Sequence, residues 1–153
     1  MKYRHIKHRS PLVALVLLIF FTTNSFAVNL VIDIRGLQYT KGNAIISLYN
    51  SKKSFAKDKE FFKQKILNIR KETKKGLLVV TFKDIPAGTY AIQVIHDTNR
   101  NGILDTNLFG APVEATGYSN NIKERYGIPD FEDAAFTVGN TNKNVVIRVA
   151  FSY

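Results

Sequence analysis

The stretch HDTNRNGILDTN, residues 96–107, has the residue types and the spacing of a calcium loop. Calcium takes six to eight hard oxygen ligands, and a curled loop turns the oxygens of alternate residues toward one point. Counted from Asp97, the first, third, fifth and ninth positions carry side-chain oxygens, the sixth is glycine, and the seventh supplies a backbone carbonyl. These positions are Asp97, Asn99, Asn101, Gly102, Ile103 and Asp105. The spacing therefore predicts a calcium loop, in which Gly102 permits the tight curl.

The twelfth position, which holds a bidentate Glu in the full calcium pattern, is Leu108 in this chain. An acid from elsewhere in the chain would have to complete the ligand shell, and the candidates are Glu114, Glu132 and Asp133. A second interpretation needs no metal. Asn and Asp side chains bond their own backbone in Asx-turns and tolerate left-handed geometry, so Asn-Arg-Asn-Gly is also a good turn. The residues leave both interpretations open.

His96 beside Asp97 raises an alternative, a hydrolase-like enzyme that uses this histidine and neighbouring acids. A general base needs an orienting partner and a nucleophile within reach. Ser119 is the tempting hydroxyl near the motif, and it lacks the Gly-x-Ser-x-Gly elbow. We expect instead that His96 supports the loop through a ring hydrogen bond. Burial of His96 would favour a binding module over an enzyme, and the absence of cysteine disfavours zinc.

A group of aromatic and amide side chains follows the loop: Tyr118, Asn120, Asn121, Tyr126 and Phe131. Such a group can form a ligand surface that stacks on a sugar or a peptide. The same residue types also hold down a long packed loop, and this packing interpretation is the one we favour from the sequence.

The N-terminal residues have the pattern of a secretory signal peptide: a basic prefix, the apolar run LVALVLLIFF, and the small-x-small end Ser25-Phe26-Ala27. As a helix, ten apolar residues span roughly 15 Å, whereas a bilayer core needs about 30 Å. The pattern predicts cleavage after Ala27, a single domain at 28–153, and no transmembrane segment after cleavage. It predicts an exported protein, periplasmic or secreted.

The net charge is +10, and it is unevenly distributed. The predicted signal peptide holds four of the 22 bases and none of the 12 acids, so the remaining chain carries +6. Residues 52–75 alone hold ten bases and three acids. This segment could meet an anionic component of the cell envelope. Its bases alternate with Phe and Ile in no known nucleic-acid motif, so we expect no nucleic-acid partner.

Seven short apolar or alternating runs, separated by turn signals, predict strands. They cover residues 28–34, 44–50, 66–70, 76–82, 90–95, 134–139 and 144–153. We expect a hairpin between the third and fourth runs, a short helix capped by Ser54, and a hydroxyl bond from Tyr90 to the nearby Pro-Ala-Gly corner. There is no βαβ rhythm, so the pattern indicates an all-β fold. We expect an antiparallel seven-stranded β-sandwich, immunoglobulin-like in architecture, with one helical insertion and one long loop over 97–130.

Three stretches together resemble a bacterial family known as domain of unknown function 2141. They are HDTNRNGILDTN at 96–107, GAPVEATGYSNN at 110–121 and GIPDFEDA at 127–134. Pro-Ala-Gly-Thr-Tyr-Ala at 86–91 also fits, whereas Ala115 stands where the family pattern prefers glycine. The resemblance implies export and a transthyretin-like sandwich, and it implies no established activity. We therefore expect a non-enzymatic binding or structural module of the cell envelope, with a calcium-stabilised loop.

Overall fold

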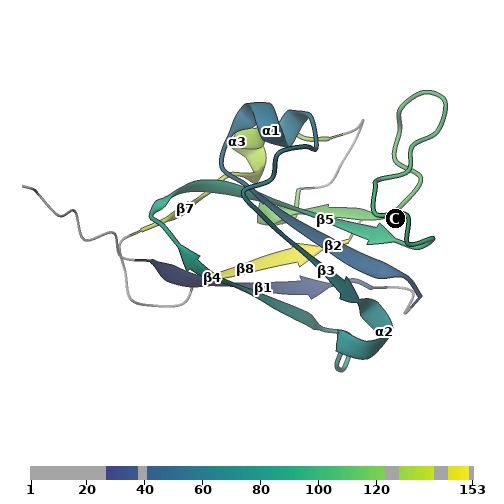
Figure 1. The fold of residues 1–153 in the computed structure, drawn as a ribbon, viewed down its shortest axis with the longest axis horizontal. Helices are drawn as coiled ribbons and strands as arrows, with labels where there is room; N and C mark the ends of the chain where they lie inside the picture. Colours follow the sequence, from purple (N-terminus) through teal and green to yellow (C-terminus); the bar gives the residue numbers. More distant parts are fainter. Residues whose placement is uncertain (1–26, 38–40, 123–127, 140–144, 152–153) are drawn as a thin grey trace, which may run out of the picture.

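The computed structural model describes residues 27–37, 41–122, 128–139 and 145–151. Its strands form two sheets, so the predicted all-β class is confirmed (Figure 1). The three-stranded sheet has the order β4 (Leu78–Ile85), β1 (Val28–Arg35), β8 (Val145–Ala150). The other sheet has the order β3 (Lys63–Asn68), β2 (Asn43–Tyr49), β5 (Gly88–Asp97), β6 (Thr116–Tyr118), and β7 (Phe136–Val138) also pairs with β5.

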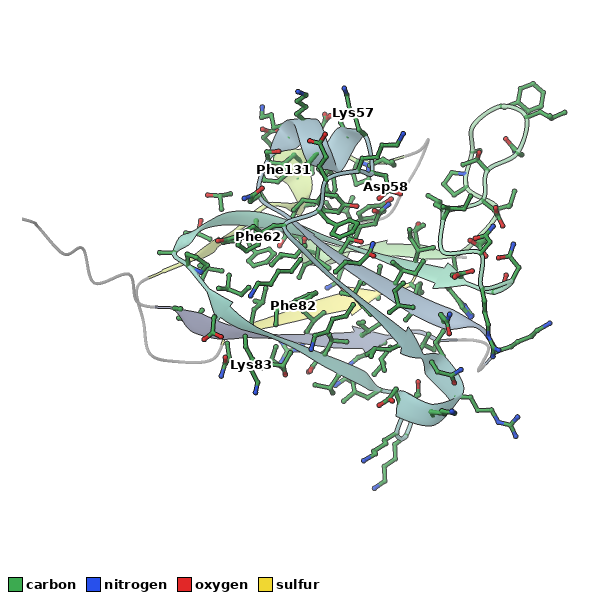
Figure 2. All side chains as sticks on the ribbon, in the orientation of Figure 1. Lys57, Asp58, Phe62, Phe82, Lys83 and Phe131 are labelled. Atoms are coloured by element: carbon green, nitrogen blue, oxygen red, sulfur yellow. The ribbon has the colours of Figure 1, made fainter. Side chains whose placement is uncertain are left out.

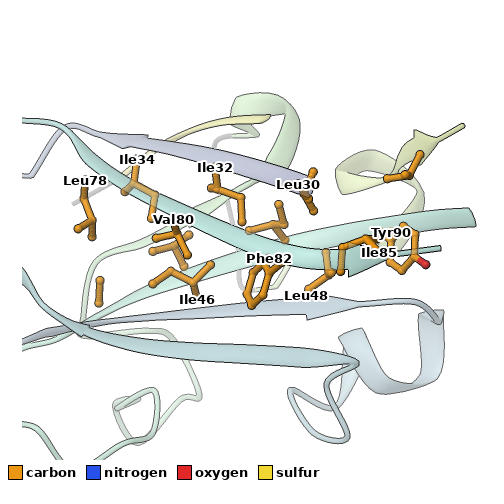
Figure 3. Close-up of a cluster of buried hydrophobic side chains, with 14 of the residues drawn as sticks. Leu30, Ile32, Ile34, Ile46, Leu48, Leu78, Val80, Phe82, Ile85 and Tyr90 are labelled. Carbon is orange, nitrogen blue, oxygen red and sulfur yellow. The ribbon is translucent and has the colours of Figure 1, made fainter. Parts of the chain in front are cut away.

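The main hydrophobic core lies where β1 and β4 of one sheet face β2 and β5 of the other (Figure 3). Strand alternation explains its composition, because every second side chain of a strand points to the same face. In β1 the buried positions are Val28, Leu30, Ile32 and Ile34, as the sequence predicted. Complete burial of each such aliphatic side chain stabilises the fold by about 1.5–3 kcal/mol.

Two features of the strands differ from the prediction. The structure has an eighth strand, β6, which lies inside the segment that we expected to be loop. The ladder between β1 and β8 is parallel, with Leu30 opposite Val145, whereas the other ladders are antiparallel. Two parallel neighbouring strands need a long connection between them. β1 and β8 can pair in this way because most of the chain lies between them.

The predicted hairpin between residues 66–70 and 76–82 is wrong. A tight turn does exist, since Lys74 and Leu77 form an isolated bridge. However, the third strand ends at Asn68, whose side chain caps the short helix α2 (Ile69–Glu72). The chain then crosses between the sheets, so that β3 pairs with β2 while β4 pairs with β1.

β3 and β4 each lie at one edge of their sheet, and two lysines of β3 bond to β4. Lys63 Nζ donates to the Lys83 carbonyl at 2.5 Å, and Lys65 Nζ donates to the Thr81 carbonyl at 2.7 Å. Lys65 also lies 5.8 Å from the centre of the Phe82 ring. Backbone carbonyls on the outer edge of β4 are thus bonded although none of the described strands pairs with that edge.

The remaining helices are α1 (Lys52–Ala56), η1 (Ser119–Asn121) and α3 (Phe131–Ala134). Of these, α1 and α3 lie together against one sheet (Figure 1). Ser51 caps α1, so the predicted Ser54 cap is wrong by one turn. A second apolar group, which we call the aromatic cluster, joins these helices to β2, β5 and β6. Its members are Tyr49, Phe55, Ala91, Tyr118, Ala134 and the partly buried Phe131 and Ile122.

The predicted Tyr90 corner is confirmed, since the Tyr90 hydroxyl donates to the Pro86 carbonyl at 3.0 Å. Within the part of the chain described, no helix has the length and apolar character needed to cross a bilayer. The predicted signal peptide lies outside the described residues except for Ala27.

Candidate functional site

The 97–115 loop starts at the last residue of β5, and strand alternation separates the two residues that open the motif. His96 and Asp97 are adjacent and fully buried, and they point to opposite faces of the sheet. His96 Nε2 lies 2.7 Å from the Lys41 carbonyl, and its ring is 5.8 Å from the Phe151 ring. Because a carbonyl only accepts, Nε2 carries the proton of this hydrogen bond. His96 thus fixes the segment before β2 against β5.

The Asp97 carboxylate holds the first turn of the loop by accepting hydrogen bonds from its backbone. Its Oδ1 accepts from the Asn101 N–H and its Oδ2 from the Gly102 N–H, both at 3.1 Å. The chain can curl over the carboxylate because Gly102 has φ +82° and Arg100 has φ +66°. A buried carboxylate that accepts two backbone N–H bonds is a well-satisfied charge, so Asp97 is positioned before any ligand arrives.

The other predicted side-chain ligands lie together in the same turn as Asp97. Asn99 Nδ2 and Asn101 Nδ2 donate to the two oxygens of Asp105, at 2.6 and 2.9 Å. The Asn99 and Asn101 carbonyl oxygens accept from the backbone N–H groups of Asn101 and Ile103 at 2.9 and 3.1 Å. The structure therefore brings Asp97, Asn99, Asn101 and Asp105 together around one turn of chain, joined by Asx-turn hydrogen bonds.

Glu114 closes the base of the loop, and it is the one candidate acid from outside the motif that the structure places there. Its Oε1 accepts from the Thr98 N–H at 2.8 Å and from the Thr98 hydroxyl at 3.0 Å, while Oε2 accepts from the Asp105 N–H at 3.3 Å. The Val113 N–H donates to the Asp105 carbonyl at 2.9 Å. One carboxylate thus joins both ends of the Asp97–Asp105 stretch.

The structure does not bring Glu132 and Asp133 to the loop. Glu132 forms an ion pair with Lys52, and the Asp133 carbonyl accepts from Asn120. Their helix α3 lies beside Ile92, because Ser119 Oγ bonds both the Ile92 N–H and the Ala134 carbonyl. Ile92 precedes Asp97 by five residues, roughly 17 Å along an extended strand. Of the three candidate acids, only Glu114 is near the motif.

The donor atoms of the loop fit calcium in type. They are carboxylate, amide and carbonyl oxygens, which are the hard ligands that calcium selects. Among the described residues no group of three or more His, Asp or Glu side chains is arranged to hold a metal. A calcium shell here would therefore need the amide oxygens of Asn99 and Asn101, which a half-turn of each side-chain amide directs toward Asp105.

Gly42 supports the loop from a distant part of the chain. It has φ +93°, and a Cβ at this position would lie 2.4 Å from the Asp97 carbonyl oxygen and 2.8 Å from the Thr98 Cα. The Lys-Gly-Asn stretch is recognisable from the sequence as a turn. Its contact with Asp97, more than fifty residues later in the chain, is not.

The proposed ligand surface of aromatic and amide residues is mostly a packing feature. Tyr118 is fully buried in the aromatic cluster, and Phe131 packs against the same cluster. Asn120 is exposed but donates to the carbonyls of Asp133 and Ala135, at 2.7 and 3.0 Å. Asn121 is exposed, and Tyr126 lies outside the described residues. The side chains that stack inside the protein leave little of this group for a ligand.

The hydrolase alternative finds no assembled site in the described residues. His96 faces the core side of β5, whereas Asp97 faces the loop, so neither orients the other. Ser119 is fully buried, and its hydroxyl is engaged with the Ile92 N–H and the Ala134 carbonyl. A base, its orienting acid and a nucleophile thus occupy three separate environments.

The basic segment 52–75 is not one surface. α1 packs with α3, near the end of β2 at Tyr49, whereas α2 packs on β3 and β4 at the opposite end, near Asn43 (Figure 1). Between them, Lys63 and Lys65 are bonded to the edge of β4. Its bases therefore divide into three groups.

Comparison with known proteins gives a family and no further relative. Residues 32–146 match the model of a family described as an uncharacterized protein conserved in bacteria, DUF2141. Neither the curated proteins nor the solved structures contain a match to the chain. The matched span runs from the middle of β1 to the start of β8 and includes the whole 97–115 loop. Since it also covers well over half of the sequence, the chain belongs to the DUF2141 family.

Proposed function

We propose that this protein is a non-enzymatic binding or structural module of the bacterial cell envelope, and that calcium stabilises its 97–115 loop. The observation that carries the proposal is the convergence of Asp97, Asn99, Asn101 and Asp105 on one turn, with Glu114 closing its base. These residues would be the ligands, together with the Ile103 carbonyl. An ion that bridges them would replace several hydrogen bonds with stronger charge-based contacts.

Export to the periplasm or the exterior is part of the same proposal. It rests on the N-terminal signal pattern, on the absence of cysteine, and on a loop that suits an environment rich in calcium. A cysteine-free exported domain lacks disulfides, so a metal that fixes its longest loop would add stability from another source. We further propose that the two sheets form a sandwich of the transthyretin-like type, which a solved structure of a family member would test.

A thermal melt of residues 28–153, which contain every described helix and strand, tests the metal. With a dissociation constant of about 10 μM, 1 mM calcium would add roughly 2.7 kcal/mol to the unfolding free energy. In a domain of this size the melting temperature would rise by roughly 10 °C over the value in chelator.

Asp105→Asn should abolish this shift, because Asp105 contacts both amide ligands but supports little of the backbone through its side chain. Glu132→Gln is the matched control, since it removes one exposed acid at α3 and should keep the full shift. Equal melting temperatures of the wild type in calcium and in chelator would reduce the loop to a metal-free set of Asx-turns.

A further inference from the structure

The end of the 97–115 loop exposes apolar side chains completely. Leu108 and Phe109 have relative exposures of 101% and 95%, and Ile103 and Val113 nearer the base are also exposed. Residues 106–113, which we call the loop tip, contain no charged residue. The loop extends away from both sheets, and the side chains at its end are directed away from the rest of the protein (Figures 1 and 2). Folding therefore leaves the two largest side chains of the tip in water.

Several backbone N–H groups of the loop tip already have hydrogen-bond partners within the tip. Asn107 Oδ1 accepts from the Phe109 and Ala111 N–H groups, and the Asn107 carbonyl accepts from the Gly110 N–H. The Asn107 N–H in turn donates to the Ala111 carbonyl. Backbone donors that are already bonded do not lose a partner when they enter an apolar medium. The tip can thus be buried without leaving these donors unsatisfied.

The end of the protein from which the loop projects, which we call the loop end, is strongly basic. Asn43 pairs with both Asp97 and Asn68, so α2 lies at this end, and the Gly42 carbonyl accepts from the Ile69 N–H. The end of β1 lies here too, since the Arg35 carbonyl bonds Phe151, whose ring meets His96. The exposed bases of the loop end are Arg35, Lys41, Arg70, Lys71, Lys74, Lys75 and Arg100.

Few acids oppose these bases. Glu72 is exposed and Asp33 and Asp105 are half-buried, while Asp97 and Glu114 are buried and bonded. The region around α1 and α3 differs, because its four lysines are accompanied by five acids: Asp58, Glu60, Asp130, Glu132 and Asp133. The apolar tip therefore lies at the end of the protein where the described positive charge is concentrated.

We infer that the loop end docks on an anionic lipid bilayer. Leu108 and Phe109 enter the interface, and the bases of the loop end lie over the headgroup phosphates. The shape selects lipid over a protein partner. One large aromatic side chain buries on the order of 200 Å², and a stable protein interface needs about 800 Å² from each partner. A bilayer can surround a narrow convex tip on all sides, and an anionic bilayer also attracts basic side chains that lie near the tip. This inference rests on the proposed envelope function and names the surface that the module binds.

A tryptophan at the tip gives a direct readout, because the chain contains no Trp. Phe109→Trp would be titrated with vesicles of equal parts phosphatidylglycerol and phosphatidylcholine, and with vesicles of phosphatidylcholine alone, each in 1 mM calcium and in chelator. We expect the emission to shift to the blue with the anionic vesicles. We expect the affinity for vesicles of phosphatidylcholine alone to be lower by about tenfold or more, since each base near an anionic surface contributes to binding. Unchanged emission with anionic vesicles would overturn the inference.

Matched variants, compared by vesicle sedimentation, separate specific docking from general stickiness. Leu108→Ser with Phe109→Ser should weaken binding about tenfold or more, whereas Phe61→Ser removes an exposed aromatic outside the loop end and should not. Arg70→Gln with Lys71→Gln should weaken binding about tenfold, and Lys53→Gln with Lys57→Gln, with the same change in charge at α1, should not. Equal losses in the two charge pairs would overturn the docking geometry.

Two further outcomes are distinguishable. If analytical ultracentrifugation showed a dimer that Phe109→Ser abolishes, a second copy would cover the tip and the lipid inference would fall. A calcium shift in the melting temperature without vesicle binding would overturn this inference alone and leave the calcium loop standing. Vesicle binding without a calcium shift would support the docking surface and remove calcium from the proposed function.

Discussion

The 97–115 loop and the described residues around η1 and α3 are held in opposite ways. The 97–115 loop is fixed by side-chain bonds to backbone from Asp97, Asn107 and Glu114, and its large apolar residues face solvent. Around η1 and α3, Tyr118 is buried and Phe131 packs in the aromatic cluster beside α1. Polar bonds can therefore hold a loop in place while its apolar residues stay available to another surface.

The largest test of this contrast replaces one phenylalanine in each region. Phe55 is buried, and its ring lies 5.3, 6.0 and 5.8 Å from the rings of Tyr49, Tyr118 and Phe131. Phe55→Ala should lower the unfolding free energy by about 3–5 kcal/mol. Phe109→Ala should change it by less than about 0.5 kcal/mol. Urea unfolding measures both, and a large loss from Phe109→Ala would mean that the tip packs on the protein in solution.

The next effect concerns the glycine under the loop. Gly42→Ala would place a Cβ against the Asp97 carbonyl in a left-handed conformation, so we expect a loss of about 2–3 kcal/mol. Gly102→Ala is the control, because nothing lies within 4 Å of its Cβ position and only the left-handed conformation, at about 1 kcal/mol, remains. If the two losses were equal, the close approach of Gly42 to β5 would contribute nothing.

Glu114→Gln tests the hydrogen bonds by which Glu114 joins Thr98 to Asp105 at the base of the loop. Glu114 accepts three hydrogen bonds, and an amide nitrogen would face an N–H group on at least one side. We expect a loss of about 2 kcal/mol, as for bonds to a charged group. Hydrogen exchange of the Thr98 and Asp105 amides should accelerate with it. Slow exchange of both amides in the variant would show that the loop base does not depend on this carboxylate.

The smallest effect belongs to the aromatic cluster and depends on pH. Burial, aided by Asp58, raises the pKa of the Tyr49 hydroxyl above its ordinary value of 10.0. The folded protein therefore favours the neutral phenol. This contribution to stability is complete below pH 10 and is lost as the pH rises toward the folded pKa, by up to about 1.4 kcal/mol per pH unit.

Tyr49→Phe should cost about 1 kcal/mol at pH 8 through the lost bonds to Asp58 and Gln93. It should also flatten the fall in unfolding free energy between pH 10 and pH 11. Tyr90→Phe is the comparison, because burial alone raises the pKa of Tyr90 and its hydroxyl has one bond, to Pro86. An alkaline slope that Tyr49→Phe leaves unchanged would contradict this assignment.

Local features of this protein were predictable from its sequence. The alternation of β1, the Tyr90 corner and the convergence of Asp97 with Asp105 all depend on residues close together in the chain. Spacing and turn chemistry determine such contacts directly. The α2 helix is local as well, and the Asn68 cap was a missed signal that would have argued against the predicted hairpin.

Long-range contacts were not predictable in the same way. The parallel pairing of β1 with β8, and the three-residue strand β6, depend on which distant edges are free once the sheets form. Glu114 and Glu132 are both acids that follow the motif, and only the path of the chain through β6 and α3 places one at the loop and the other beside Lys52. A single sequence carries no periodicity that distinguishes them.

The two lysine bonds at the edge of β4 bear on how the protein behaves at high concentration. An unpaired edge is a template for strand addition between molecules, and inward-reaching lysines are one means of blocking it. Here Lys63 and Lys65 occupy the carbonyls of Lys83 and Thr81 that an incoming strand would need. Acetylation of these two lysines would free those carbonyls and remove two charges, turning a protected edge into a site where aggregation could begin.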